Sequence, residues 1–270
     1  MEETNHKRRV RYAGKYPKKF EEKYKEHSPE KYADTVAKVI EKGSTPAGMH
    51  IPIMVQEILD FLEIKPGQQG LDCTLGYGGH TGKMLEQLGG QGRLISLDVD
   101  PIESEKTVKR LREAGFSEDN FIFRLINFAN IDKVAEECGK FDFVLADLGV
   151  SSMQIDNPER GFSYNYDEPL DMRMDQESPV KASDILNGWS QEELLRIIRD
   201  YGEERYASAI ARNIIKEREI KPLETTGDLA RVIRASVPMK MQEKFGNPCK
   251  RTFKAVRIAC NRELDVLQDS

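Results

Sequence analysis

The sequence predicts an α/β fold with a parallel β-sheet and a separate helical insertion. Between residues 70 and 148, short apolar runs of strand length alternate with helix-like segments, a pattern typical of parallel strands joined by crossover helices. The first run opens into a glycine-rich turn, whereas residues 183–237 are helical by pattern throughout. Ligands of such sheets bind beyond the carboxyl ends of the strands, so we expect the functional site there.

Composition limits the class of protein. The 270 residues, 39% of them apolar, suffice for a large domain with an insertion. No apolar run approaches the roughly 18 residues that span a bilayer, and residues 1–12 are too charged for a signal sequence, so we expect a cytoplasmic protein without membrane contact. The four cysteines are far apart and form no C-x-x-C pair, which argues against a zinc site and against a disulfide framework.

The charge distribution bears on nucleic-acid binding. A net charge of -5 argues against indiscriminate coating of nucleic acid, which relies on many Lys and Arg, so an RNA partner must contact a local patch. Residues 1–48 form a predicted basic N-terminal extension, because residues 1–42 hold 12 Lys or Arg against 8 Asp or Glu, interspersed with tyrosines. The extension could be a solvated, partly helical segment or an RNA contact.

The elements of the predicted core, residues 49–182, follow in chain order. A helix at 55–62 ends before Lys65-Pro66-Gly67, a strong stop signal. Four strands are then expected at 70–75, 93–98, 121–126 and 141–148, separated by helices near 81–88, 102–114 and 131–138. Residues 151–180 lack periodicity, and loops of that length inside a compact domain are usually functional or disordered.

The remaining chain is predicted to be helical. Residues 183–240 form the expected insertion, in which Ser190-Gln191-Glu192-Glu193 fits a capping box. Residues 241–270 are expected to return to the core through one last helix, at about 251–267.

The glycine-rich turn after the first strand predicts a nucleoside-cofactor pocket. Thr81 stands where a dinucleotide fingerprint beginning at Gly76 requires glycine, which weakens the case for NAD. S-adenosyl-L-methionine needs close backbone, an acid for its ribose hydroxyls and an apolar wall for adenine. Asp98 and Phe128, which follow the second and third strands, supply the acid and the wall. We therefore expect S-adenosyl-L-methionine, with a nicotinamide oxidoreductase as the disfavoured alternative.

Asp147 ends the fourth strand and is the candidate catalytic residue. In methyl transfer to an exocyclic amine, the nitrogen lone pair is conjugated with the ring, so the amine must be held in line with the methyl group. A carboxylate can accept one N–H bond of that amine or contact the cofactor. Asp147 could instead only cap the turn that follows its strand.

Six ordered segments resemble the MraW/RsmH family of S-adenosylmethionine-dependent methyltransferases. They are His50-Ile51-Pro52-Ile53, Asp72 to His80, Asp147 to Gln154, Glu159-Arg160-Gly161-Phe162-Ser163, Pro169-Leu170-Asp171-Met172-Arg173-Met174, and Arg251-Thr252-Phe253-Lys254-Ala255 through Asn261-Arg262-Glu263-Leu264. The resemblance covers about residues 49–268 and implies a class I, Rossmann-like methyltransferase sheet. It also implies methylation of a cytidine N4 in the decoding region of 16S ribosomal RNA, either free or in the assembled 30S subunit.

The resemblance also implies roles for individual residues. By position, the cofactor site comprises Gly78, Gly79, His80, Asp98, Phe128, Asp147 and Gln154. The helical insertion would help to grip the RNA. No strong general base is required at Asp147, since the proton can leave after transfer. We expect no metal, because His50 and His80 have no carboxylate at ligand spacing.

The candidates for substrate contact are Arg160, Phe162, Tyr164, Arg173 and Arg251. The aromatic residues near Arg160 could stack a flipped-out cytosine, as enzymes that modify splayed bases often require. They could equally pack their loop against the helical insertion. Lys250, Arg251, Lys254 and Arg257 suggest a basic face for phosphate, although Arg257 could pair with Glu263 instead.

The end of the chain carries a separate expectation. The family continues beyond the last helix into further strands, with a segment resembling I-S-F-H-S-L-E-D-R, whereas this sequence stops at Ser270. Without a neighbouring fifth strand, Phe143-Val144-Leu145 would be an open sheet edge. We therefore expect an incomplete version of a longer protein. A catalytically silent RNA- or cofactor-binding form is the alternative function.

Overall fold

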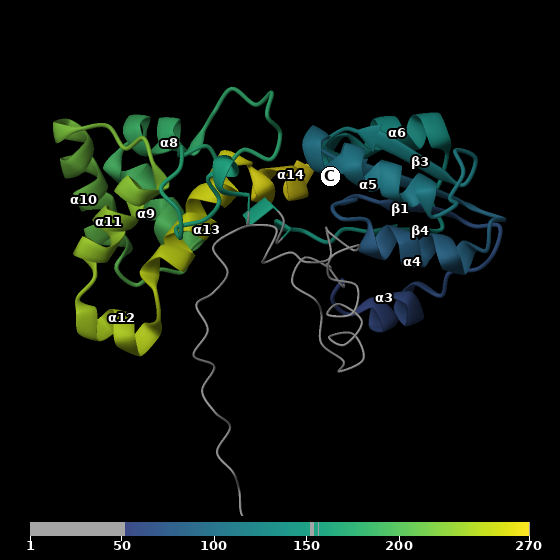
Figure 1. The fold of residues 1–270 in the computed structure, drawn as a ribbon, viewed down its shortest axis with the longest axis horizontal. Helices are drawn as coiled ribbons and strands as arrows, with labels where there is room; N and C mark the ends of the chain where they lie inside the picture. The colour runs from purple at the N-terminus through teal and green to yellow at the C-terminus, as the bar shows by residue number, and fades with distance from the viewer. Residues whose placement is uncertain (1–51, 152–153, 156, 270) are drawn as a thin grey trace, which may run out of the picture. The chain divides into compact units, whose positions relative to one another are not determined.

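The computed structural model describes residues 52–269 except 152, 153 and 156. The predicted basic extension at residues 1–48 and the residue His50 lie outside the described residues. Figure 1 shows the arrangement of the described helices and strands.

Four parallel strands form one sheet in the order β3-β2-β1-β4. They are β1 (Gln69–Asp72), β2 (Arg93–Asp98), β3 (Phe121–Leu125) and β4 (Phe143–Leu145). Leu71 of β1 pairs with Ile95 of β2 on one side and with Val144 of β4 on the other. Strands β2 and β3 follow one another on one side of β1, whereas β4 lies on its other side. The strand order therefore reverses between β1 and β4, which creates the switch point where ligands of such folds bind. The predicted α/β fold is confirmed.

Helices cover both faces of this sheet (Figure 1). The first face packs against α3 (Val55–Leu62), α4 (Gly79–Leu88) and α5 (Pro101–Glu113). The second face packs against α6 (Ile131–Cys138) and the short 3-10 helix η2 (Phe128–Asn130) before it. Successive residues of β2 point to opposite faces of the sheet. Leu94 packs in the apolar cluster on the first face, and Ile95 packs in the cluster on the second face.

Gly70 of β1 leaves no room for a side chain, because the neighbouring strand β4 lies too close. A Cβ at this position would lie 2.1 Å from the ring of Phe143 in β4. The absent side chain therefore lets the Phe143 ring cover β1, and Phe143 is buried. In the described part of the chain, β4 pairs with β1 alone.

The helical part begins after the loop that contains the 3-10 helix η3 (Pro158–Arg160). Its helices are α8 (Ala182–Gly188), α9 (Gln191–Asp200), α10 (Ala207–Ile220), α11 (Thr226–Ser236), α12 (Met239–Phe245), α13 (Pro248–Cys260) and α14 (Glu263–Asp269). The predicted capping box of α9 is confirmed: the Ser190 hydroxyl accepts from the Glu193 N–H, and the Glu193 carboxylate accepts from the Ser190 N–H.

One apolar core joins the helices to the preceding loop. It contains Phe162, Leu170 and Met172 of the loop, together with residues of α8 to α11 and of α13. The structure therefore packs α13 among the helices expected as residues 183–240, and not against the sheet. The reason is the apolar face of α13, where Phe253 and Val256 are buried in this core.

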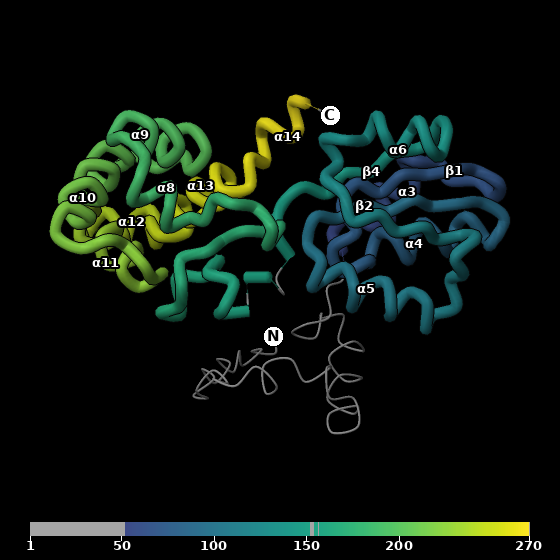
Figure 2. The backbone as a smooth tube through the Cα atoms, turned by 90° about the horizontal axis from the view of Figure 1, so that it is seen from above, coloured from purple at the N-terminus to yellow at the C-terminus, as the bar shows by residue number. Residues whose placement is uncertain are grey.

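The last helix differs from the expected single helix at 251–267. The chain breaks at Asn261 and Arg262, and Arg262 has a φ of 50°, a left-handed conformation that ends α13. The Asn261 side chain fixes this break, because it donates to the Met172 carbonyl and accepts from the Met174 N–H. Figure 2 follows the backbone from α13 into α14, which contacts η2. No described helix has the length and apolar character that a bilayer span requires.

Candidate active site

Asp98, at the carboxyl end of β2, has a carboxylate fixed by backbone groups. One oxygen accepts the N–H of Gly76 at 2.8 Å, and the other accepts those of Val99 at 2.8 Å and Asp100 at 2.9 Å. Burial raises the pKa of Asp98, although these hydrogen bonds oppose the shift. The carboxylate is thus held in one orientation at the end of its strand, beside the glycine-rich turn.

The glycines of that turn shape its backbone and its packing. Gly78 has a φ of 75° as the N-cap of α4, and a Cβ there would lie 2.7 Å from the Thr107 methyl group. A Cβ at Gly79 would lie 2.8 Å from the ring of Pro52. The two glycines therefore let α5 and the Pro52 segment approach the turn.

A cavity of about 240 Å³, here called the strand-end cavity, lies at the carboxyl ends of the strands. The predicted residues Asp98 and Phe128 both line it. Leu148 and Gly149, which directly follow Asp147, line it as well. Further lining residues, which the sequence analysis did not place at the cofactor site, include Cys73, Met174, Cys260, Asn261 and Glu263. The last three come from the turn into α14, whose position depends on tertiary packing and has no signal in the local sequence.

Asp147 is not among the residues that line this cavity, but it directly precedes Leu148, which does, and its carboxylate is accessible. Its side chain is 49% exposed, and one carboxylate oxygen lies 3.6 Å from Nδ1 of His80. The backbone N–H of Asp147 donates to the Thr74 hydroxyl at 2.8 Å. Nε2 of His80 lies 3.0 Å from the Ile53 carbonyl, which can only accept, so Nε2 donates to it and Nδ1 faces Asp147.

Asp72 connects the start of α4 to the Asp147 segment. One of its oxygens accepts from the Thr81 hydroxyl at 2.5 Å, and the other accepts from the Thr74 N–H at 3.1 Å. The side chain is buried, and burial raises its pKa. Asp72 thus orients Thr74, which in turn holds the backbone of Asp147. Asp72 begins one of the six segments that resemble the family, but no role was predicted for it from the sequence.

Gln154 and Arg160 are not among the residues that line the strand-end cavity. The two side chains donate to the same oxygen of Asp100, at 2.8 Å and 2.9 Å. Asp100 uses its other oxygen to cap α5 through the N–H groups of Ile102 and Glu103. This cluster therefore anchors the loop after β4 to the start of α5.

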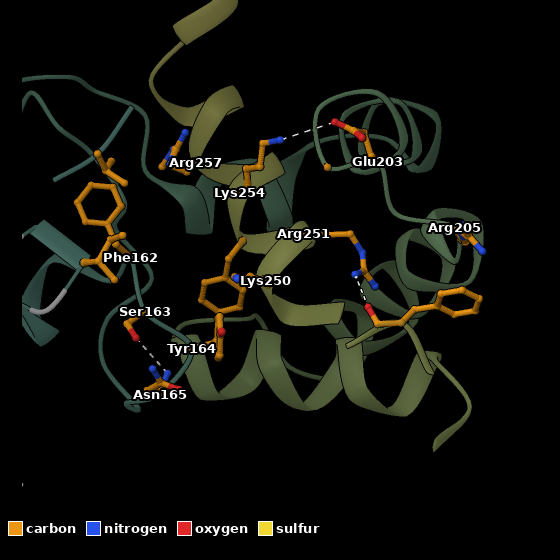
Figure 3. A pocket seen from close by; sticks show the side chains of 15 residues that line it. Phe162, Ser163, Tyr164, Asn165, Glu203, Arg205, Lys250, Arg251, Lys254 and Arg257 are labelled. Carbon is orange, nitrogen blue, oxygen red and sulfur yellow. Dashed lines mark hydrogen bonds and ion pairs between the residues drawn. The ribbon is translucent and has the colours of Figure 1, made fainter. Parts of the chain in front are cut away.

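A second cavity of about 640 Å³, here called the basic cleft, lies among the loop after β4, α13 and the residues between α9 and α10 (Figure 3). Of the predicted substrate contacts, Phe162, Tyr164 and Arg251 line it. So do the other three residues of the predicted basic face, Lys250, Lys254 and Arg257. The residues Arg205 and Phe245, which the sequence analysis did not single out, also line it.

Two of the predicted substrate residues, Tyr164 and Arg173, make contacts with other side chains of the protein. Tyr164 packs edge to face against Phe253 with ring centroids 5.6 Å apart. Arg173 does not line the cleft, because its guanidinium pairs with Asp171 at 2.8 Å. Burial of Asp171 favours a higher pKa, but hydrogen bonds from Arg173 outweigh it and lower that pKa.

The arginines of the cleft also make internal pairs. Arg251 donates to the buried Glu204 at 2.6 Å, and Arg257 pairs with Glu263 at 2.8 Å, which was the alternative considered for it. Within the described residues, no cluster of three potential metal ligands occurs.

Comparison with known proteins adds family evidence. The model of the MraW methylase family matches residues 47–270. The chain is 55% identical to "Ribosomal RNA small subunit methyltransferase H 1" of Agathobacter rectalis, over 99% of this chain and 78% of that protein. It is 53% identical to the protein of the same name from Lachnoclostridium phytofermentans, over 98% of this chain and 74% of that protein. These alignments include most of the N-terminal extension, so the relatives share it.

Proposed function

The chain belongs to the MraW methylase family, and from this premise we propose that it transfers a methyl group from S-adenosylmethionine to the N4 of a cytidine in 16S ribosomal RNA. The observation that carries the proposal is the strand-end cavity, where Asp98 and Phe128 meet the segment that directly follows Asp147. An acid, an aromatic wall and a candidate amine-orienting group thus come from three different strand ends.

The residues of the strand-end cavity fit a nucleoside cofactor. The Asp98 carboxylate is held in place by three backbone N–H groups, so its remaining lone pair, on the oxygen that accepts from Gly76, can accept a ribose hydroxyl without further reorganisation. Phe128 offers an aromatic face for adenine. When bound, S-adenosylmethionine supplies an activated methyl group on its sulfonium. The proposed cofactor site also includes Gly78, Gly79 and Gln154, because the two glycines shape the turn beside Asp98 and Gln154 anchors the loop through Asp100.

Asp147 has the geometry to orient the acceptor amine. Its backbone is fixed by Thr74 while its carboxylate is half exposed beside His80. The carboxylate accepts one N–H bond of the cytidine amine, which aligns the nitrogen for in-line attack. The amine becomes acidic once it is methylated, so its proton can pass to water afterwards, and Asp147 acts by orientation.

The acceptor reaches this point from the basic cleft. Leu148 and Gly149 line the strand-end cavity, and Val150, the next residue, lines the cleft. One short segment after Asp147 thus borders both hollows. Tyr164 and Arg251 are the predicted substrate contacts that remain at the cleft to meet the RNA, whereas Phe162 is buried in the apolar core.

A methylation assay tests this function. The protein is incubated with S-adenosylmethionine carrying a labelled methyl group and with small ribosomal subunits that lack the modification, or with the free 16S ribosomal RNA. We expect label at a cytidine N4, identified by nuclease digestion and mass spectrometry. Label on another atom or base would overturn the proposal. Binding of S-adenosylhomocysteine without any turnover would instead favour the catalytically silent form.

A further inference from the structure

The basic cleft concentrates positive charge on an otherwise acidic protein. Among the described residues, its lining contains Arg205, Lys250, Arg251, Lys254 and Arg257, with Glu203 as the only acid. The net charge of the chain is -5, so this local excess does not follow from composition. Figure 3 shows the cations of α13 and Arg205 around the same hollow. Such a patch attracts an anionic ligand.

Two of these cations are free to bind an anion. Arg251 is paired with the buried Glu204, and Arg257 with Glu263. Lys254 lies 3.8 Å from Glu203. Among the described residues, Arg205 and Lys250 have no acidic partner, and both are exposed. Their charges are therefore uncompensated at the cleft.

Aromatic rings accompany the free cations. The Arg205 guanidinium lies over the Phe245 ring, 4.2 Å from its centroid, which fixes the flexible arginine in a stacked position. Tyr164 lines another part of the cleft and is braced by Phe253. Cations for phosphate next to rings for bases are the features of sites that bind single-stranded nucleic acid.

We propose that the basic cleft is a subsite for single-stranded RNA next to the target nucleotide, in which Arg205 and Lys250 bind phosphate groups while Tyr164 stacks an unpaired base. This inference rests on the proposed function, because it identifies the substrate form that the site accepts. An unpaired strand is required, since bases within a duplex are already stacked on their neighbours. The bordering segment after Asp147 places this strand beside the site of methyl transfer.

Fluorescence anisotropy with a short labelled single-stranded RNA, titrated at several salt concentrations, tests the subsite. The Arg205→Ala/Lys250→Ala variant should bind about tenfold more weakly. Its salt slope should fall by about 1.4, because each phosphate contact on a single strand contributes about 0.7. Tyr164→Leu should weaken binding about fivefold or more, with an unchanged salt slope, since it removes stacking and no charge.

Matched variants separate the subsite from general charge and from misfolding. Lys109→Ala/Lys216→Ala removes two exposed cations that line neither hollow, and it should leave the affinity and the salt slope unchanged. Arg205→Lys/Lys250→Arg keeps both charges and should retain most of the affinity. Every variant should bind S-adenosylhomocysteine like the wild type, as measured by calorimetry.

The proposal is overturned if Arg205→Ala/Lys250→Ala binds RNA like the wild type, if the control pair has the same effect, or if a duplex RNA binds as well as the single strand. Failure of the proposed function has a different signature. In that case the wild-type protein would not bind S-adenosylhomocysteine, whatever the RNA titrations show.

Discussion

Arg160 and Asp100 form a buried ion pair. The guanidinium nitrogen lies 2.9 Å from the carboxylate oxygen, and the two side chains are 5% and 1% exposed. Arg160 also donates to the carbonyls of Arg173 and Met174. Asp100 caps α5 two residues after Asp98. This pair therefore connects the loop after β4 to the end of β2, where Asp98 is the carboxylate predicted to bind the ribose.

Removal of Arg160 is expected to destabilise the fold strongly. Arg160→Ala leaves the Asp100 carboxylate buried without its cationic partner, which costs about 3–5 kcal/mol in the free energy of unfolding. Urea denaturation measures this loss. As a control, Arg199→Ala breaks the exposed pair with Asp200 and should leave the free energy of unfolding nearly unchanged, because water and salt screen such pairs. Equal losses in the two variants would contradict the role given to Arg160.

The glycine turn before α4 yields a second prediction. Gly78 and Gly89 both have left-handed backbone, with φ of 75° and 60°, but only Gly78 has neighbours that a Cβ would meet. Gly89→Ala should therefore lower the free energy of unfolding only by the cost of left-handed backbone for alanine, about 1–2 kcal/mol. Gly78→Ala should lower the free energy of unfolding by more, because Thr107 and Leu111 must also move. Thermal unfolding of both variants checks the order, and a smaller loss at Gly78 would argue against close packing of the turn on α5.

Asp72 should make stability depend on pH. Its folded pKa is raised by burial above the ordinary 3.8, so the protonated form is favoured in the folded state. The stability it contributes is full below the ordinary pKa and is lost as pH rises through the folded value. The free energy of unfolding of the wild type should thus fall relative to that of Asp72→Asn above pH 3.8. Denaturation curves collected across this range test the prediction, and parallel pH profiles would refute it.

Asp147 should affect turnover and not cofactor affinity. Asp147→Ala removes both acceptor oxygens, so the amine is no longer oriented. We expect kcat to fall by about 100-fold or more, while the affinity for S-adenosylhomocysteine stays near that of the wild type. Single-turnover methylation together with calorimetry separates the two effects. Unchanged kcat would show that Asp147 only ends its strand.

The core of the site was predictable because it follows the order of the strands. Apolar runs located the strands, and their carboxyl ends located Asp98 and Phe128, which the structure brings to one cavity. The capping box at Ser190 was equally legible, because its residues are three positions apart. These features depend on local sequence and on the geometry of parallel sheets.

Features that depend on distant partners were not predictable. Arg160 stands beside aromatic residues and was therefore a candidate for RNA contact, but its partner Asp100 is 60 positions away. The break at Arg262 has no glycine or proline, and it is held by hydrogen bonds from Asn261 to the loop at Met172 and Met174. Arg205 gains significance only because the fold stacks it on Phe245.

The central claim is that the strand ends hold an adenosyl cofactor with Asp98 on the ribose. Calorimetric titration of S-adenosylhomocysteine into the wild type, Asp98→Ala and the exposed control Asp119→Ala tests it most directly. We predict binding by the wild type and by Asp119→Ala, and no measurable binding by Asp98→Ala, with the helical content of all three unchanged in circular dichroism. An Asp98→Ala protein that binds like the wild type would contradict the claim, as would a wild type that binds NAD in place of the adenosyl ligand.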